Sequence, residues 1–158
     1  MPPRVALGLF VALLAVAPFA LNEFYVTLMN YIGLATLVTL GLVLLTGVAG
    51  LTSFGQAAFV GVGAYTAAYL ATQSSLSPWL TLLIGLAITA AVALFLGFIT
   101  LRMGGHYLPL GTIAWGISLY FLFGNLEFLG GHTGISGIPT IALFGLELKS
   151  SRSFYYLI

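Results

Sequence analysis

The chain has 158 residues, of which 61% are hydrophobic and 4% are charged, and its mean hydropathy is +1.17. Water-soluble domains carry about 25% charged residues, so this composition excludes a soluble globular domain and also a disordered chain. The net charge of +1 gives no basis for binding nucleic acid, and the absence of cysteine excludes disulfides and thiolate chemistry.

Residues 24–101 form a stretch of 78 positions without Asp, Glu, Lys or Arg. At roughly 20 residues per crossing, this stretch is long enough for three passes through a bilayer. We therefore predict an all-α fold, a polytopic transmembrane helix bundle embedded in lipid. Two histidines and three acidic residues leave little material for a catalytic or metal site, so the composition favours a conduit or scaffold over an enzyme.

The first apolar segment, residues 5–21, follows Arg4 and has Ala15-Val16-Ala17 where a signal-peptide cleavage site would lie. Pro18 fits the residue after a cleaved bond poorly, and more hydrophobic segments follow directly. A retained first membrane helix is therefore favoured over a cleaved leader. The second apolar segment, residues 24–45, is long enough to span the bilayer with some tilt.

Residues 46–56 interrupt the second segment with three glycines and four polar side chains, which disfavours a continuous helix. The next apolar block, residues 57–71, would be roughly 22 Å long at 1.5 Å per residue, shorter than a hydrocarbon core of about 30 Å. This mismatch predicts a broken or re-entrant element within the membrane that is packed against protein.

Two clearer helices follow the break. Residues 72–78 predict an aqueous loop, and residues 80–101 are the strongest spanning helix in the chain. Residues 102–106 predict a turn before another apolar helix at 107–123. The remainder is glycine-rich and polar at 124–139, apolar at 141–146, polar at 147–153 and similar to the first turn of a helix at 154–158.

The orientation of the helices in the membrane is predicted from the few charged residues. Placing Arg4 on the cytoplasmic side also places Arg102 there, in agreement with the positive-inside rule. The same topology leaves Lys149 and Arg152 outside, against the rule. We predict a cytoplasmic N-terminus.

Three motifs stand in order along residues 45–139. The first has the spacing G-x-x-G-x-x-S-x-G-x-x-x-F-x-G-x-G-A-Y, and its residues are Gly47, Gly50, Ser53, Gly55, Phe59, Gly61, Gly63, Ala64 and Tyr65. The second is Leu101-Arg102-Met103-Gly104-Gly105-His106-Tyr107, followed by Thr112. The third is the glycine-rich loop at residues 130–139, which ends in Ile138-Pro139.

This set of motifs resembles the permease subunits of the branched-chain amino-acid ABC importers. The resemblance implies a multi-pass permease of the bacterial cytoplasmic (inner) membrane that binds no cofactor. Its implied partners are ATP-binding subunits, a second permease subunit and a soluble solute-binding protein. Family permeases are longer, so residues 1–158 are interpreted as a single transmembrane domain, the amino-terminal part of an apparently truncated permease. Gly-Gly-His before Tyr107 replaces a more usual acidic position, so no role for that acid carries over.

The candidate site residues come from these motifs. The predicted substrate pathway comprises Ser53, Gln56, Tyr65, Tyr107 and Thr112, and the predicted structural glycines are Gly50, Gly55, Gly61 and Gly63. Ser53 and Gln56 either contact substrate or satisfy backbone groups at the helix break. Tyr65 is either a gate or a packing aromatic.

No metal site is expected, because Glu127 and His132 supply only two ligands. The glycines at 130–137 are not a phosphate loop, since neither a preceding strand nor a following Lys-Ser/Thr is present.

Three functional hypotheses remain open. The leading one is a permease subunit of an ABC importer for branched-chain or related amino acids. The second is a permease of the same family for another small polar solute, such as urea or an amide. The third is an independent, small homo-oligomeric membrane channel.

Overall fold

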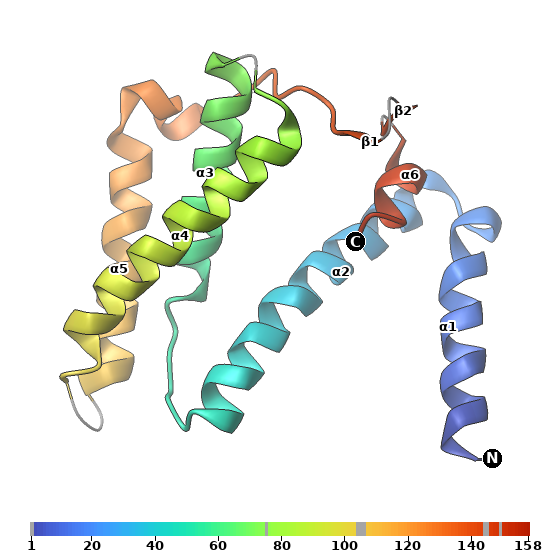
Figure 1. The fold of residues 1–158 in the computed structure, drawn as a ribbon, viewed down its shortest axis with the longest axis horizontal. Coiled ribbons are helices and arrows are strands. Elements are labelled where there is room, and N and C mark those ends of the chain that lie inside the picture. The colour runs from blue at the N-terminus through green and yellow to red at the C-terminus, as the bar shows by residue number, and fades with distance from the viewer. Residues whose placement is uncertain (1, 75, 104–106, 144–145, 149) are drawn as a thin grey trace. The chain divides into compact units, whose positions relative to one another are not determined.

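The computed structural model describes residues 2–74, 76–103, 107–143, 146–148 and 150–158 (Figure 1). Five long helices make up most of the chain: α1 (Pro3–Ala20), α2 (Glu23–Val43), α3 (Gln56–Gln73), α4 (Pro78–Thr100) and α5 (Tyr107–Asn125). Two short strands, β1 (Ala142–Leu143) and β2 (Leu146–Glu147), pair antiparallel and precede the short helix α6 (Ser151–Tyr155). The all-α prediction is confirmed, and the small hairpin is an addition to it.

Four helices of the described chain are long and apolar enough to cross a membrane: Pro3–Ala20, Glu23–Val48, Pro78–Thr100 and Tyr107–Asn125. Their exposed surfaces are rich in large apolar side chains, which is what lipid contact requires. The predicted spans at 5–21, 24–45, 80–101 and 107–123 therefore correspond closely to observed helices. Each observed helix differs from its predicted span by a few residues at its ends.

The chain divides into two compact units. Unit 1 contains Met1–Leu37 and Ala142–Ile158, and unit 2 contains Val38–Ile141. That residues 1–158 form a single transmembrane domain stays a prediction.

Unit 1 is held together by its terminal segment. Pro18 and Val26 are the largest fully buried side chains, and the α6 region makes polar contacts with α1 and α2. Asn30 Nδ2 donates to the carbonyl oxygen of Ser151 at 3.0 Å. The helix predicted to begin at residue 154 begins instead at Ser151, because Ser150 caps it by accepting a hydrogen bond from the Arg152 N–H.

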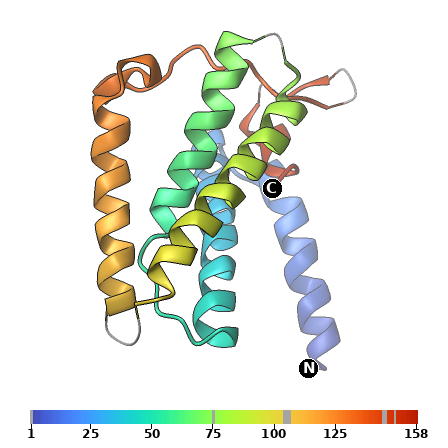
Figure 2. The same cartoon turned by 60° about the vertical axis from the view of Figure 1, so that its left-hand side comes forward.

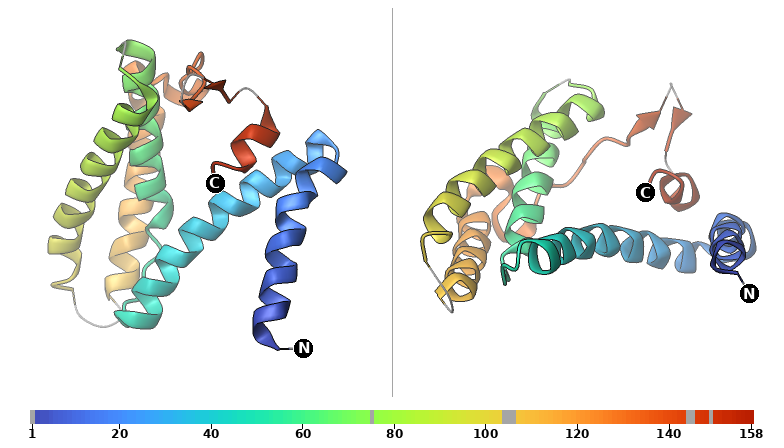
Figure 3. Two further views of the ribbon diagram at one scale, coloured as in Figure 1. Left: turned by 45° about the vertical axis from the view of Figure 1, so that its right-hand side comes forward. Right: turned by 60° about the horizontal axis from the view of Figure 1, so that its bottom comes forward.

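Unit 2 is built on three helices. Two short connections make α4 run antiparallel to α3 and to α5, and α3 contacts both of the others (Figures 2 and 3). Ser77 caps the N-terminus of α4 by accepting from the Leu80 N–H, and Pro78 occupies the first turn, where its missing N–H does no harm.

The predicted break between the second and third helices is present, with different limits. Leu44–Val48 continues the helix as a π-helical turn, and α3 begins at Gln56, so the irregular backbone covers 49–55. The third helix has 18 residues instead of the predicted 15, because Gln56, Thr72 and Gln73 join it. Thr72 fits there since its hydroxyl donates to the Ala68 carbonyl at 3.0 Å.

Candidate functional site

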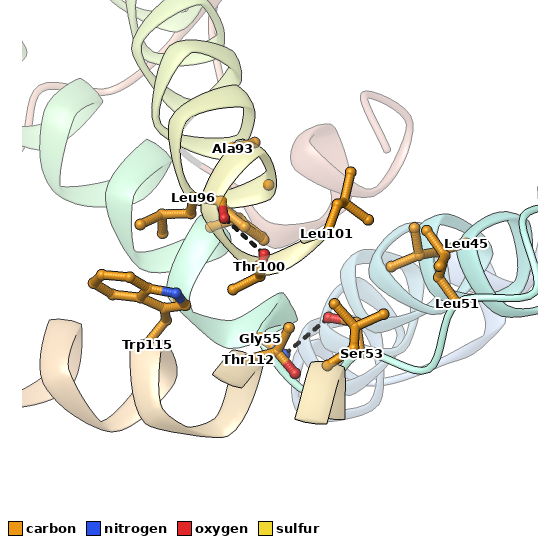
Figure 4. Close-up of a pocket in the computed structure, with 14 residues that line it drawn as sticks. Leu45, Leu51, Ser53, Gly55, Ala93, Leu96, Thr100, Leu101, Thr112 and Trp115 are labelled. Atoms are coloured by element: carbon orange, nitrogen blue, oxygen red, sulfur yellow. Dashed lines mark hydrogen bonds between the residues drawn. The ribbon is translucent and has the colours of Figure 1, made fainter. Parts of the chain in front are cut away.

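A pocket of about 250 Å³ lies inside unit 2, next to the irregular backbone at 49–55 (Figure 4). Its walls come from that segment and from the facing sides of α3, α4 and α5. The lining residues are Leu45, Leu51, Ser53, Gly55, Ala58, Phe59, Ala93, Leu96, Gly97, Thr100, Leu101, Leu108, Thr112 and Trp115.

The irregular wall is attached to α5 by one side chain. The backbone N–H of Phe54 donates to Thr112 Oγ1 at 3.0 Å, and the Thr112 hydroxyl donates to the Pro109 carbonyl at 2.9 Å. In a membrane an unpaired N–H has no water to bond, so this contact satisfies a donor that the helix break leaves free. Thr112 therefore connects the break to the first turns of α5.

Two small residues give the break its tight geometry. Ser53 is buried, and its Oγ accepts a hydrogen bond from the Gly55 N–H at 3.3 Å (Figure 4). A Cβ at Gly55 would lie 3.4 Å from the Thr112 carbonyl oxygen and 3.5 Å from its Cβ, which is ordinary contact. A methyl group at Gly55 would therefore already touch α5.

The α4 wall is formed by one face of that helix. Ala93, Gly97 and Thr100 follow at intervals of four and three residues, which places them on the same side. Leu101 comes directly after the helix, four residues beyond Gly97. Thr100 is buried, and its hydroxyl donates to the Leu96 carbonyl at 2.6 Å. The hydroxyl proton is therefore already used within the helix.

The pocket is mainly apolar in character. None of the described residues that line it is charged, and its side-chain polar groups are the three hydroxyls of Ser53, Thr100 and Thr112 and the indole N–H of Trp115. In Figure 4, Trp115 lies on the side opposite to Leu45 and Leu51. A cavity with these walls suits a small ligand with an aliphatic part, in the way that ligand sites combine apolar walls with a few polar groups.

The structure brings some of the predicted pathway residues together and separates others. Ser53 and Thr112 line the pocket, whereas Gln56 and Tyr107 do not. Tyr107 begins α5 and its side chain is 67% exposed. Tyr65 stacks on Phe123 of α5 with ring centroids 4.8 Å apart, a packing contact within unit 2. The assignment of these five residues to a substrate pathway stays a prediction.

The other candidate glycines lie at close approaches or at a turn. A Cβ at Gly61 would lie 2.8 Å from the Phe123 ring, and a Cβ at Gly63 would lie 3.1 Å from Thr89 Oγ1 of α4. Gly50 has φ +66°, a left-handed conformation that ends the helix and lets the Leu51 N–H reach the Leu45 carbonyl at 3.1 Å.

The second and third motifs are seen in part. Residues Gly104, Gly105 and His106 of the second motif lie outside the described residues, as does Lys149 of the orientation argument. In the third motif Gly130 has φ +80°, and a Cβ there would lie 2.1 Å from the Gly134 carbonyl oxygen, so only glycine fits.

Among the described residues no group of three or more His, Cys, Asp or Glu could hold a metal ion.

Sequence reasoning missed most of the α4 and α5 walls, including Leu96, Thr100 and Trp115. The available signal was the spacing of small and hydroxyl residues at 93, 97 and 100, but the same helix also carries Gly85, Ala87, Thr89, Ala90 and Ala91. Such spacing is common in apolar helices, and it does not show which face borders a cavity.

Comparison with known proteins gives a consistent result. Residues 24–157 match the family model described as "Branched-chain amino acid transport system / permease component". The chain is 37% identical over 144 residues to the high-affinity branched-chain amino acid transport system permease protein LivM of Salmonella typhimurium. It is 38% identical over 143 residues to the protein of the same name from Escherichia coli.

These alignments cover 89% and 88% of the chain and 34% of each relative. The chain thus spans about a third of the length of the curated relatives that it matches. No solved structure matches it.

Proposed function

The chain belongs to the family of permease components of branched-chain amino acid transport systems, and on that premise we propose that it forms part of the membrane pathway of an ABC importer. It is a multi-pass membrane protein. The proposed cargo is a branched-chain or related amino acid, and the proposed location is the bacterial cytoplasmic membrane.

The observation that carries the proposal is the pocket beside the helix break. Transporters place substrate sites where a membrane helix is interrupted, because unwound backbone supplies polar groups there without exposing them to lipid. Here the interruption at 49–55 borders a cavity of about 250 Å³ that has apolar walls and hydroxyls from Ser53, Thr100 and Thr112. The apolar walls favour an aliphatic side chain over urea, whose surface is polar throughout.

The proposal assigns different tasks to the residues of the pocket. The apolar faces of Phe59, Leu96 and Trp115 receive the aliphatic side chain, and Ser53 stands at the polar end. Thr112 acts by positioning, because it holds the Phe54 N–H and thereby the irregular wall. ATP-binding subunits, a second permease subunit and a soluble binding protein complete the proposed importer, and this chain itself binds no nucleotide.

The test is ATP-dependent uptake of leucine into proteoliposomes. The vesicles contain the permease that includes residues 1–158, together with the ATP-binding subunits, second permease subunit and binding protein of its own operon. We expect Ser53→Ala and Thr112→Val to lower leucine uptake by roughly tenfold or more, the size expected for loss of one or two well-placed polar contacts.

Thr36→Val is the matched control, because the Thr36 hydroxyl donates to the Ile32 carbonyl at 2.7 Å and the residue lies outside the pocket. Its uptake should equal that of the wild type. Uptake of urea but not leucine would replace the amino-acid assignment with the small-polar-solute alternative. Uptake that requires neither ATP nor the partner subunits would favour the channel.

A further inference from the structure

Gly97 stands out among the residues that line the pocket. It lies in the C-terminal half of α4, and a Cβ built on it would meet no heavy atom within 4 Å. Packing therefore does not explain the absence of a side chain at this position. Glycine inside a helix costs about 1 kcal/mol relative to alanine, so the helix would gain stability from a methyl group here.

Two other glycines of the α3–α4 contact show what a packing glycine looks like. A Cβ at Gly63 would lie 3.1 Å from Thr89 Oγ1, and a Cβ at Gly85 would lie 3.3 Å from the Gly63 carbonyl oxygen. Both permit the two helices to approach closely. Gly97 is on the same helix as Gly85 but makes no such approach, so its open space must have a different origin.

That open space faces the pocket. Ala93 lies one turn before Gly97, and Leu101 lies one turn after it, and all three line the cavity. Residues four apart share one face of a helix, so a side chain at position 97 would extend into the same cavity as its neighbours. The remaining walls include bulky side chains such as Phe59, Leu96 and Trp115.

We propose that Gly97 is the residue that sets the size of the aliphatic side chain admitted by the pocket. This inference rests on the proposed function, and it adds a specificity determinant to it. With hydrogen at position 97 the cavity keeps room for the larger branched side chains. Added carbon atoms at this position would occupy that room and discriminate against the longer substrates first.

The experiment compares leucine and valine uptake, since the two side chains differ by one methylene. The same complete importer in proteoliposomes carries Gly97→Ala or Gly97→Val, and the leucine-to-valine uptake ratio is divided by that of the wild type. One binding protein serves every variant, so its own selectivity cancels in this quotient. One methylene in a tight apolar pocket is worth roughly 10-fold or more in discrimination. We expect the ratio to fall about 10-fold in Gly97→Val and by a smaller factor in Gly97→Ala.

Gly116→Val is the matched control. Gly116 is also a helix-interior glycine of unit 2 with no heavy atom within 4 Å of a built Cβ, but it does not line the pocket. Both valine variants change helix propensity equally, and the control ratio should stay at the wild-type value. Gly97→Ala keeps the test decisive if Gly97→Val yields no folded complex.

Three results would overturn the inference. An unchanged leucine-to-valine ratio in folded Gly97 variants, with normal wild-type uptake, refutes the size-setting role and leaves the proposed function intact. An equal fall in Gly116→Val shows that any added bulk disturbs the bundle, and it refutes the role as well. Absence of amino-acid uptake by the wild-type importer refutes the proposed function and this inference together.

Discussion

The Tyr155 hydroxyl donates a hydrogen bond of 3.0 Å to the carbonyl oxygen of Leu14, 141 positions earlier in the chain. Leu14 lies four residues before Pro18, which is inside α1 and has no N–H to give to that carbonyl. The tyrosine thus supplies the donor that the proline removes. Because lipid offers no substitute donor, this contact couples the terminal segment of unit 1 to its first helix.

Replacement of Tyr155 by phenylalanine should destabilise unit 1. We expect a loss of about 0.5–1.5 kcal/mol, the net value of one hydrogen bond, measured as a shift in the unfolding midpoint in detergent. Tyr156→Phe is the control. Its hydroxyl donates to the Ala15 carbonyl at 2.8 Å, but that carbonyl also has the Phe19 N–H within the helix, so its loss should cost less.

A double-mutant cycle tests the cause. Pro18→Ala restores an N–H that can reach the Leu14 carbonyl, so Tyr155→Phe should cost less in the Pro18→Ala background than in the wild type. Strict additivity of the two changes would show that the tyrosine acts through something other than the freed carbonyl.

Gly50 should tolerate asparagine better than alanine. Its φ of +66° lies in the left-handed region, where L-residues other than asparagine and aspartate are strained by about 1–2 kcal/mol, while a Cβ there meets no heavy atom within 4 Å. Thermal unfolding in detergent should rank stability as wild type, then Gly50→Asn, then Gly50→Ala. Equal stability of the two variants would mean that the backbone relaxes out of this conformation.

Gly63→Leu should prevent assembly of the permease. The Cβ alone would approach Thr89 Oγ1 at 3.1 Å, and further carbons would force α3 and α4 apart. Overpacking of this kind costs about 1–3 kcal/mol or more. Gly41→Leu is the matched control, since a Cβ at Gly41 in α2 meets nothing within 4 Å. The measurement is the yield of monodisperse complex on size-exclusion chromatography, and a normal yield for Gly63→Leu would refute the close contact.

Cysteines on either side of α4 should be labelled from opposite faces of the membrane. The helix has 23 residues, roughly 35 Å at 1.5 Å per residue, enough to cross a core of about 30 Å. Leu76→Cys and Met103→Cys flank it at exposed positions, and the wild type contains no cysteine to give background. An impermeant thiol reagent should reach one of them in intact right-side-out vesicles and the other only in inverted ones. Reaction of both from the same side would remove this span.

The sequence by itself determined the properties that depend on neighbouring residues. The charge-free stretch at 24–101 is enough to predict membrane helices, because the cost of burying charge in lipid applies to each residue wherever it packs. The helix break was also predictable, since Gly50, Ser53 and Gly55 disfavour a helix locally. The exact limits of the helices around the break were not predictable from the sequence. The π-helical turn at Leu44–Val48 extends the second helix past Thr46, and the hydrogen-bonded Thr72 lies within the third helix.

Only the tertiary structure decided which helix faces meet. The contact between Phe54 and Thr112 joins residues 58 positions apart, and the local hydrophobic pattern of neither segment indicates this hydrogen bond. The same holds for Tyr155 and Leu14, and for the position of Gly97 beside a cavity while Gly85 lies in a helix contact. In a chain that is apolar on every side, hydrophobic patterning does not distinguish a lipid-facing surface from a packed one. The choice is made by shape and by the pairing of the few polar groups.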